Sequence, residues 1–335
     1  FFFQNLLHWS IDVISISGTV IARSKDLIND TLKTGEIEIS VKELEVLNVS
    51  SPLPMSVHDR EASTEEHRLK YRYLELRNAE LQHNLIIRHK TTQVVRNFLT
   101  DQNFIEIETP VLTKSTPEGA RDYLVPSRVH NGKFYALPQS PQMYKQLFMI
   151  SGLDRYFQIV KCFRDEDLRS DRQPEFTQID LEMSFVDEEH VRDMVEQLII
   201  TVFKEVNNVK MDMPFPTLSY EEALNRFGTD KPDMRYDIEL QNFKPFSDQS
   251  DFKAFKDADS VNMINVENSE FFSRKIISEL DTYAQSLGAK GLAWMKYNDS
   301  SFEGGISKFF ETKLQSSIAS EWSINNNSIC FMVAD

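Results

Sequence analysis

The chain has 335 residues and a formal net charge of −15, and 41% of its residues are hydrophobic. This length and composition predict a globular protein of two or three domains, and no apolar run approaches the roughly 20 residues of a membrane-spanning helix. The acidic balance argues against binding of nucleic acid by bulk charge, although a local basic patch could still bind it. Cys162 and Cys330 lie in no metal-ligand spacing, which favours a reducing compartment without structural zinc.

The first residues indicate part of a small β domain. The opening FFFQNLL lacks a basic leader and a cleavage site, so we expect no secretion signal, and without an initiating Met we expect pieces of the natural chain to be missing. Residues 13–49 alternate with period two, and Gly18 and Gly35 fall where bulges or turns are expected. Two or three strands cannot close a barrel, and an inert β-ribbon is the alternative. The stretch SSPLPMS is typical of a linker.

A long helix followed by a strand is predicted next. After the charged stretch DREASTEEHRLKYRYLELR, apolar residues recur at helical spacing over residues 79–102. The strand FIEIETP follows, and Pro110 is expected to end it because proline cannot donate to a ladder. The apolar residues that share one helical face are Ile87, Val94, Val95, Phe98 and Leu99.

A polar turn is predicted within TKSTPEGARDYLVPSR. Pro117 and Gly119 bracket Glu118, and both flanking residue types favour tight turns. A glutamate on such a turn is usually a surface residue, so the residues alone assign it no role.

The segment PQSPQMYKQLFMISG predicts a short helix. Ser140 suits its N-cap, Pro141 suits its first position and Gly152 suits its end. Gln142 and Lys145 then share one face of the first turns, near the positive end of the helix dipole. An amide, an ammonium group and free backbone donors at that point suit a carboxylate ligand, and the alternative is a lysine that faces solvent.

Residues 155–185, RYFQIVKCFRDEDLRSDRQPEFTQIDLEMSF, predict an antiparallel hairpin with a long charged connection between its strands. Alternation in the first strand places Gln158, Val160, Cys162 and Arg164 on one face and Phe157, Ile159, Lys161 and Phe163 on the other. Alternation in the return strand separates a polar face from a face that packs on a core. The polar residues are Gln178, Asp180, Glu182 and Ser184, and the core residues are Ile179, Leu181, Met183 and Phe185.

Charged and amide groups converge at one end of this hairpin. Arg164 closes one strand beside Asp165 and Glu166, while Gln178 and Asp180 open the other. A guanidinium group can clamp anionic oxygens and a carboxylate can accept from an ammonium group, so this end could hold a zwitterion or a phosphate. The ordinary alternative is a solvated sheet face with a surface loop.

Beyond the hairpin, the stretch DEEHVRDMVEQLIITVFKEV is amphipathic and is expected to cover the sheet. The stretch SYEEALNRFG begins with a capping box formed by Ser219 and Glu222, and it stops at Gly228. From about residue 236 to residue 335, short β-like and helical pieces such as GLAWMKY and KFFETKLQSSI predict a separate α+β module.

The string FRDE followed by RQPEFTQID resembles motif 2 of the class II aminoacyl-tRNA synthetases, specifically of bacterial-type aspartyl-tRNA synthetases. The strings TPEGA, QSPQ-x-x-K and FGTDKPDMR are similar to segments of the same family. The resemblance implies an α+β fold, with the class II antiparallel-sheet catalytic core, a partial N-terminal OB-fold β-barrel and an α+β insertion domain. The implied domains are residues 1–57 for the partial OB-fold anticodon-binding domain, 58–78 for a hinge, 79–235 for the catalytic core with motifs 1 and 2, and 236–335 for the bacterial-type insertion domain.

The resemblance also implies an ATP-dependent aminoacyl-tRNA ligase. Such an enzyme activates L-aspartate with ATP to aspartyl-adenylate and transfers the aspartyl group to the 3′ end of tRNA(Asp), with tRNA(Asn) as a second candidate acceptor. Mg²⁺ is the implied metal ion and bridges the phosphates of ATP. The family further implies a cytoplasmic homodimer, built through motif 1, with no membrane partner.

Roles for individual residues follow from the same resemblance. Arg164 is the implied catalytic residue, because it would hold the α-phosphate and the reacting carboxylate. The implied aspartate-binding residues are Glu118, Gln142, Met143, Tyr144, Lys145, Arg164 and Asp180. The implied ATP-binding residues are Arg164, Asp165, Glu166, Gln173 and Phe176, with Phe176 stacking on adenine. No metal ligand is expected among the residues of this sequence.

One part of the family pattern is absent. The sequence contains no Gly-rich motif 3 with its Arg, and it stops at FMVAD inside the expected insertion domain. We interpret this as missing residues and expect the chain by itself to be inactive; the alternative is a non-catalytic tRNA-binding or regulatory paralogue. Sister enzymes for asparagine or lysine are the nearest rivals, and Lys145 argues against lysine by like-charge repulsion. Since neither a Walker-A string nor a dinucleotide fingerprint occurs, we expect the antiparallel sheet to provide the nucleotide scaffold.

Overall fold

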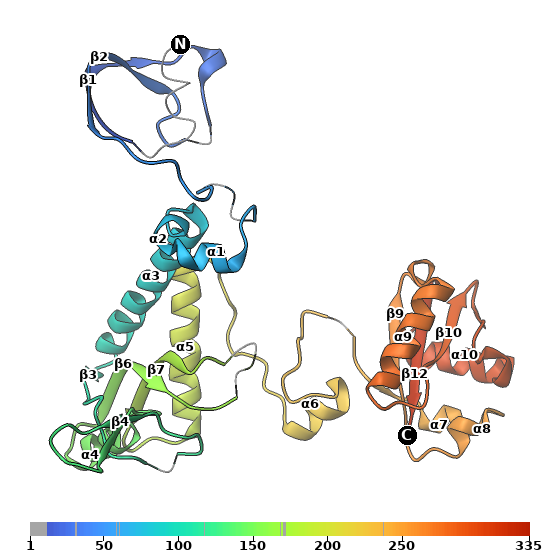
Figure 1. Cartoon of the computed structure of the whole chain (residues 1–335). Coiled ribbons are helices and arrows are strands. Elements are labelled where there is room, and N and C mark those ends of the chain that lie inside the picture. Colours follow the sequence, from blue (N-terminus) through green and yellow to red (C-terminus); the bar gives the residue numbers. More distant parts are fainter. Residues whose placement is uncertain are drawn as a thin grey trace. The chain divides into compact units, whose positions relative to one another are not determined.

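A computed structural model gives the structure of the chain (Figure 1). The chain divides into two compact units, one that ends at Pro214 and one that runs from Phe215 to Asp335. No helix in the described part of the chain has the length and apolar character required to cross a membrane. The opening FFFQNLL and the predicted turn residue Pro117 lie outside the described residues. The structure describes residues 12–335 apart from Thr31, His58, Arg60, Pro117, Leu168, Ser170, Asp171 and Asp237.

The predicted β segment near the start forms a single antiparallel hairpin. Strands β1 (Val13–Ala22) and β2 (Ile37–Asn48) pair along their length, with the short 3-10 helix η1 (Lys25–Leu27) between them. The register shifts between Ser17 and Gly18, as expected for a bulge, and a Cβ on Gly18 would come within 2.3 Å of the Ser40 carbonyl oxygen. Membership of this hairpin in an OB-fold barrel stays a prediction.

Two short helices lie in the segment that was expected to be a hinge. Helices α1 (Glu65–Lys70) and α2 (Arg72–Glu75) precede the long helix α3 (Ala79–Asp101). Glu75 is buried, and its carboxylate pairs with Arg68 at 3.2 Å and with Arg72. The side chain of Asn78 caps α3 by accepting from the Glu80 N–H, which confirms the predicted long helix.

A three-stranded sheet forms the centre of the first unit. Its strands are ordered β3 (Ile105–Glu106), β6 (Arg155–Phe163) and β7 (Glu175–Met183), with β3 parallel and β7 antiparallel to β6. Helices α3 and α5 (Glu188–Asn207) lie side by side and pack on one face of this sheet (Figure 1). The buried residues of this layer are Val95, Leu99, Phe104, Phe157, Met194 and Leu198.

Four local predictions for this unit are wrong. Ile179 does not pack on the core, because it is 43% exposed and is not part of the apolar layer. Pro110 does not end the strand before it, because β3 stops at Glu106. Phe185 does not pack on the core: β7 ends at Met183, and Phe185 has a φ of 57° and is 99% exposed. Ser140 is not a helix cap, because its hydroxyl donates to Glu118 and the residue at the cap position is Pro141.

A short strand pair and a further helix complete the first unit. Strands β4 (Leu124–Pro126) and β5 (Phe134–Ala136) form a short antiparallel pair. Helix α4 (Gln142–Ile150) follows and ends, as predicted, before Gly152, whose φ of 87° suits glycine. Helix α4 contacts both β6 and β7, so it covers the part of the hairpin where the polar residues lie.

The second unit is an α+β module, as predicted for its last hundred residues. Helix α6 (Tyr220–Phe227) is capped by Ser219, whose hydroxyl accepts from the Glu222 N–H, and it ends at Gly228 with a φ of 70°. Its sheet has the order β11 (Ser301–Glu303), β10 (Ala293–Asn298), β12 (Ser328–Ala334), β9 (Val261–Glu267) and β8 (Gln241–Asn242). The remaining helices are α7 (Lys244–Ser247), α8 (Lys253–Lys256), η2 (Ser269–Phe271), α9 (Arg274–Ser286), η3 (Ser307–Phe309) and α10 (Thr312–Glu321).

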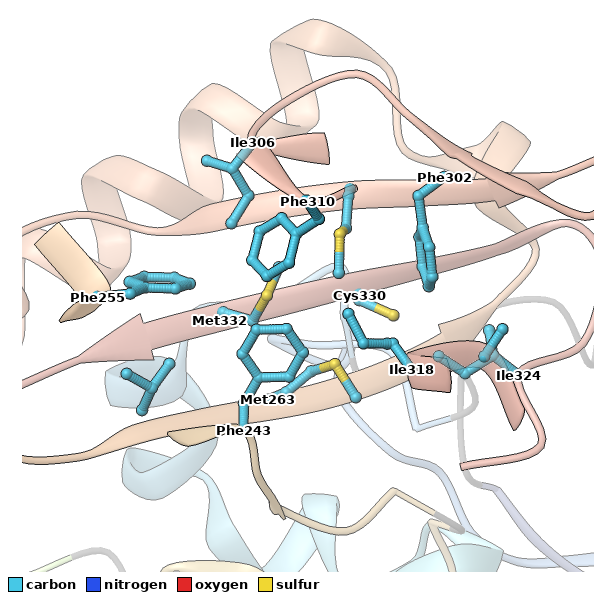
Figure 2. Packing of buried hydrophobic residues seen from close by; sticks show 13 residues of the cluster. Phe243, Phe255, Met263, Phe302, Ile306, Phe310, Ile318, Ile324, Cys330 and Met332 are labelled. Atoms are coloured by element: carbon cyan, nitrogen blue, oxygen red, sulfur yellow. The ribbon is translucent and has the colours of Figure 1, made fainter. Parts of the chain in front are cut away.

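Apolar layers cover both faces of the sheet in the second unit. Alternation along β12 sends Cys330 and Met332 into a large cluster that contains Phe243 and Met263 (Figure 2). The intervening residues Ile329 and Phe331 pack on the opposite face, where Ile277 of α9 meets them. Strand β12 is therefore the buried centre of this unit.

Candidate active site

The pairing of β6 with β7 gathers polar side chains on one face. Gln158 lies opposite Asp180, Val160 opposite Gln178, and Tyr156 opposite Glu182. Residues that face each other in an antiparallel pair project to the same side of the sheet. The predicted polar face is therefore confirmed, and α4 lies over it.

Lys145 of α4 is paired with two carboxylates on this face. Its Nζ atom lies 2.9 Å from Oδ1 of Asp180 and 3.5 Å from Oε2 of Glu182, and Gln178 Nε2 donates to the same Oδ1 at 3.2 Å. Asp180 is 3% exposed, and its second oxygen, Oδ2, accepts no hydrogen bond from the described residues. A buried carboxylate oxygen without a donor is costly, so this atom is suited to accept from a ligand.

A buried hydrogen-bond network lies beside this pair. Oε1 of Gln158 accepts from the Thr109 hydroxyl at 2.9 Å and from the Tyr156 hydroxyl at 3.0 Å. Burial and the neighbouring negative charge of Asp180 raise the pKa of Tyr156 above its ordinary value. Tyr156 therefore stays a neutral donor and holds the floor of the site in place.

Arg164 lies where β6 ends, and its guanidinium group stacks on the ring of Phe176 at 5.1 Å from Cζ to the ring centroid. The Arg164 N–H also donates to the Pro174 carbonyl at 2.9 Å, which joins the two strands at the start of the connection. The Cys162 thiol is buried on the same face, and burial together with the charge of Asp180 raises its pKa to about 11. The thiol is therefore protonated at neutral pH and is no nucleophile there.

The other predicted ATP-binding residues lie in the charged connection. Asp165 forms an ion pair with Arg121, with 3.7 Å between the guanidinium Nε and Oδ2, and Glu166 lies 3.6 Å from Arg172. Gln173 is exposed. The structure thus brings Arg164 and Phe176 together, whereas Gln173 lies on the surface.

Glu118 and the helix residues border the same region. Oε2 of Glu118 accepts from the hydroxyl of Ser140 at 2.8 Å, and Ser140 lies two residues before the start of α4. Gln142 and Tyr144 are half-buried on α4, whereas Met143 is 54% exposed.

Two residues of this region were not assigned a role by the sequence. Glu182 is the second carboxylate partner of Lys145, and its period-two spacing from Asp180 could have indicated this. Gln139 is 1% exposed and bonds to residues 120 and 122, a contact between segments that no spacing in the sequence reveals.

The second unit holds a separate cavity of about 910 Å³. Its apolar lining includes Phe252, Ile277 and Trp294. The charged residues of the lining are Asp257, Arg274, Asp281 and Lys290. None of the residues predicted for the active site lies in this cavity. Within the described residues, no group of three or more His, Cys, Asp or Glu side chains is placed to hold a metal ion.

Comparison with known protein families gives one match over most of the chain. The model of the tRNA synthetases class II (D, K and N) matches residues 64–332. The chain therefore belongs to this family of class II tRNA synthetases.

Curated relatives within this family are about 50% identical to the chain. The aspartate–tRNA ligase of Streptococcus thermophilus (strain ATCC BAA-250 / LMG 18311) is 50% identical over 324 residues, which are 96% of this chain and 55% of the relative. The aspartate–tRNA(Asp/Asn) ligase of Syntrophotalea carbinolica is 52% identical over 306 residues, which are 90% of this chain and 51% of the relative. The chain thus spans about half the length of the curated relatives that it matches.

Solved structures agree on the fold. The asparaginyl-tRNA synthetase of Pyrococcus horikoshii, complexed with asparaginyl-adenylate, matches with a TM-score of 0.53 at 16% identity, covering 96% of this chain and 77% of that one. The asparaginyl-tRNA synthetase of Entamoeba histolytica matches with a TM-score of 0.54 at 16% identity, covering 96% and 78%. The mixed α and β architecture of the class II catalytic core is therefore shared.

Proposed function

We propose that the protein that carries this chain is an aspartate–tRNA ligase. It would activate L-aspartate with ATP and transfer the aspartyl group to tRNA(Asp), with tRNA(Asn) as a further candidate acceptor. The observation that carries this proposal is the half-buried Lys145, whose ammonium group lies between Glu182 and the buried Asp180 on the polar face of the β6–β7 hairpin. A cation enclosed by carboxylates offers both signs of charge, which a zwitterion with an anionic side chain needs. The names of the curated relatives support this choice of amino acid.

The proposed roles follow the charges of the site. Lys145 would bind the side-chain carboxylate of aspartate, and Oδ2 of Asp180, which lacks a donor among the described residues, would accept from its ammonium group. Gln142 would share that ammonium group, and Glu118 would close the site. Met143 and Tyr144 would line the same turn of α4. A lysine substrate would bring a second ammonium group towards Lys145, which disfavours it by charge repulsion.

Activation would proceed by displacement at phosphorus. A carboxylate oxygen of aspartate would form a bond to the α-phosphorus of ATP, and the bond from that phosphorus to the pyrophosphate oxygen would break, so that pyrophosphate leaves with the electron pair. Arg164 would hold the α-phosphate and the reacting carboxylate, and no side chain needs to act as nucleophile. One oriented donor of this kind is worth about 10²–10³ in rate. Asp165, Glu166 and Gln173 would contact ATP.

Phe176 already has one face of its ring covered in the structure. In the structure its ring is stacked by the Arg164 guanidinium group, so adenine would occupy the opposite face of the ring or displace the arginine. Mg²⁺ is proposed as the counter-ion of the ATP phosphates, where it would neutralise charge.

The remaining proposals concern the whole protein. We propose that residues 1–57 form part of an anticodon-binding OB-fold domain, that residues 58–78 connect it to the catalytic core at 79–235, and that residues 236–335 belong to an insertion domain. A homodimer and a cytoplasmic location are the accompanying proposals.

The decisive experiment is ATP–pyrophosphate exchange by the protein that carries this chain, with aspartate, asparagine and lysine supplied in turn. Exchange that depends on aspartate alone is the expected result. No exchange with any of the three amino acids, in protein shown to be folded by its thermal transition, would replace the proposal with a non-catalytic tRNA-binding or regulatory paralogue.

A further inference from the structure

The side chain of Gln139 is fully enclosed and fully bonded. Only 1% of the residue is exposed, yet its amide group makes three hydrogen bonds to one short segment, residues 118–122. Its Nε2 atom donates to the Ala120 carbonyl at 2.8 Å and to Oδ1 of Asp122 at 2.5 Å, and its Oε1 atom accepts from the Ala120 N–H at 3.2 Å. Both N–H groups and the carbonyl oxygen are used, so the orientation of the amide is fixed.

This side chain bonds to the preceding segment just beyond the β4–β5 pairing. The β4–β5 pairing aligns Leu124 with Ala136 and continues where the Leu137 N–H donates to the Tyr123 carbonyl at 2.9 Å. The next residue, Pro138, faces the opposite side, where its carbonyl accepts from the Phe163 N–H at 2.9 Å. Beyond it, the side-chain amide of Gln139 bonds to Ala120 and Asp122, because it offers the same donor and acceptor as a peptide group.

The same segment is held on its other side by the end of β6. The Asp165 N–H donates to the Arg121 carbonyl at 3.0 Å, and Arg121 Nε lies 3.7 Å from Oδ2 of Asp165. Ser140, the residue after Gln139, donates to Glu118 at 2.8 Å. Residues 118–122 are therefore fixed between the segment that leads into α4 and the start of the charged connection.

We propose that Gln139 is a positioning residue for amino-acid binding. By holding Ala120 and Asp122, it sets the place of the Glu118 carboxylate, which Ser140 binds two residues before the start of α4 at Gln142. Gln139 acts through Glu118 and contacts no substrate itself. The proposal rests on the proposed aspartate activation, and it adds the residue that keeps the Glu118 segment in a binding-competent conformation.

Hydrogen exchange tests the clamp independently of any activity. Gln139→Met keeps the length of the side chain and removes all three hydrogen bonds, so the backbone N–H groups of residues 118–122 should exchange at least about tenfold faster, since protection reports local opening. Thr113→Val is the matched control, because it removes a side-chain bond to the Ala136 carbonyl, 3.1 Å long, without touching that segment. Unchanged exchange in Gln139→Met would overturn the proposal.

Kinetics test the role in binding. In ATP–pyrophosphate exchange, Gln139→Met should raise the KM for aspartate about tenfold, while kcat and the KM for ATP change by less than about threefold, since only a uniform binding contribution is lost. An unchanged KM for aspartate, or an equal rise in both KM values, would overturn the positioning role. A wild-type protein without aspartate-dependent exchange would overturn the proposed function and this role with it, while the hydrogen-exchange result would still decide whether the clamp exists.

A second variant tests the proposal if Gln139→Met does not fold. Gln139→Glu keeps the volume and the acceptor for the Ala120 N–H, but its carboxylate cannot donate and faces Asp122. It should therefore raise the KM for aspartate at pH 8 and recover part of the loss at pH 5, where a carboxylic acid regains one donor. A KM for aspartate equal to that of the wild type at both pH values would contradict the proposal.

Discussion

In the second unit, β12 lies between two apolar layers, whereas the β6–β7 hairpin of the first unit has an apolar layer on one side only. One face of the hairpin packs Phe157 against α3 and α5, and the other buries the Lys145–Asp180 pair. Replacing such a pair by apolar residues of similar volume is often neutral or stabilising, because desolvation of the charges offsets their attraction. The ionic face is therefore not needed for stability, which is the physical reason to regard it as the site.

The largest expected effect comes from the apolar sheet. Phe243 is fully buried in the second unit, so Phe243→Ala should lower the free energy of unfolding of that unit by about 3–5 kcal/mol. Denaturant unfolding followed by the fluorescence of Trp294 and Trp322 would measure it. Phe271→Ala is the matched control, because Phe271 is 64% exposed, and its cost should stay below about 1 kcal/mol. Equal losses in both variants would contradict the assignment of the core.

A single and a double substitution on the ionic face should change stability by different amounts. Lys145→Met leaves the buried Asp180 without its cation and should cost about 3 kcal/mol, whereas adding Asp180→Asn should restore most of that stability. Aspartate-dependent pyrophosphate exchange should stay at least about 10²-fold reduced in both variants, because the substrate carboxylate has lost its partner.

Lys161→Met serves as the control within the same hairpin. Lys161 is 55% exposed and pairs with Glu175 at 2.7 Å, so its loss should cost less than about 1 kcal/mol. If Lys145→Met proved as stable as Lys161→Met, the pair at Asp180 would not be buried as described.

A smaller effect is expected in the network beneath the pair. Thr109→Val removes one of the two donors to Gln158 and should lower the free energy of unfolding by about 1–2 kcal/mol. Tyr156→Phe removes the other donor and should give a loss of the same order, measured by the same denaturant titration. Because both donors share one acceptor, the loss of unfolding free energy in the double variant should differ from the sum of the two single losses. Strict additivity would contradict the shared acceptor.

The smallest effect should appear only at high pH. Burial raises the pKa of Cys162 to about 11 and that of Cys330 to about 12, above the ordinary value of 9.0. Well below pH 9 both thiols are protonated in the folded and the unfolded chain, so stability does not depend on them. Between pH 9 and pH 11 the unfolded chain loses these protons first, so stability should fall as pH rises.

Denaturant unfolding of two variants between pH 8 and pH 11 would check this. Cys162→Ala and Cys330→Ala should each flatten the decline, the first in the unit with the ionic face and the second in the apolar unit. A decline that stays as steep in both variants would assign it to other groups.

Periodicity was sufficient to predict the hairpin and its faces, because period-two alternation fixes which side of a strand each residue takes. Periodicity failed for Phe185, because the alternating pattern of the sequence continues past Met183, where the strand ends. The preference of serine for helix caps failed for Ser140, because its hydroxyl donates to the Glu118 carboxylate of another segment. The family resemblance named the residues around Lys145, but the contacts of Gln139 and Glu182 arise only when segments far apart in the sequence meet.

Strand β12 also constrains the order of events during synthesis. It lies between β9 and β10, yet it follows both in the chain, so these two strands leave the ribosome before the strand that joins them exists. Until residues 328–334 arrive, β9 and β10 expose unpaired edges and the apolar residues of two layers. We therefore expect the second unit to assemble late and in one cooperative step, with its nascent form dependent on protection from aggregation.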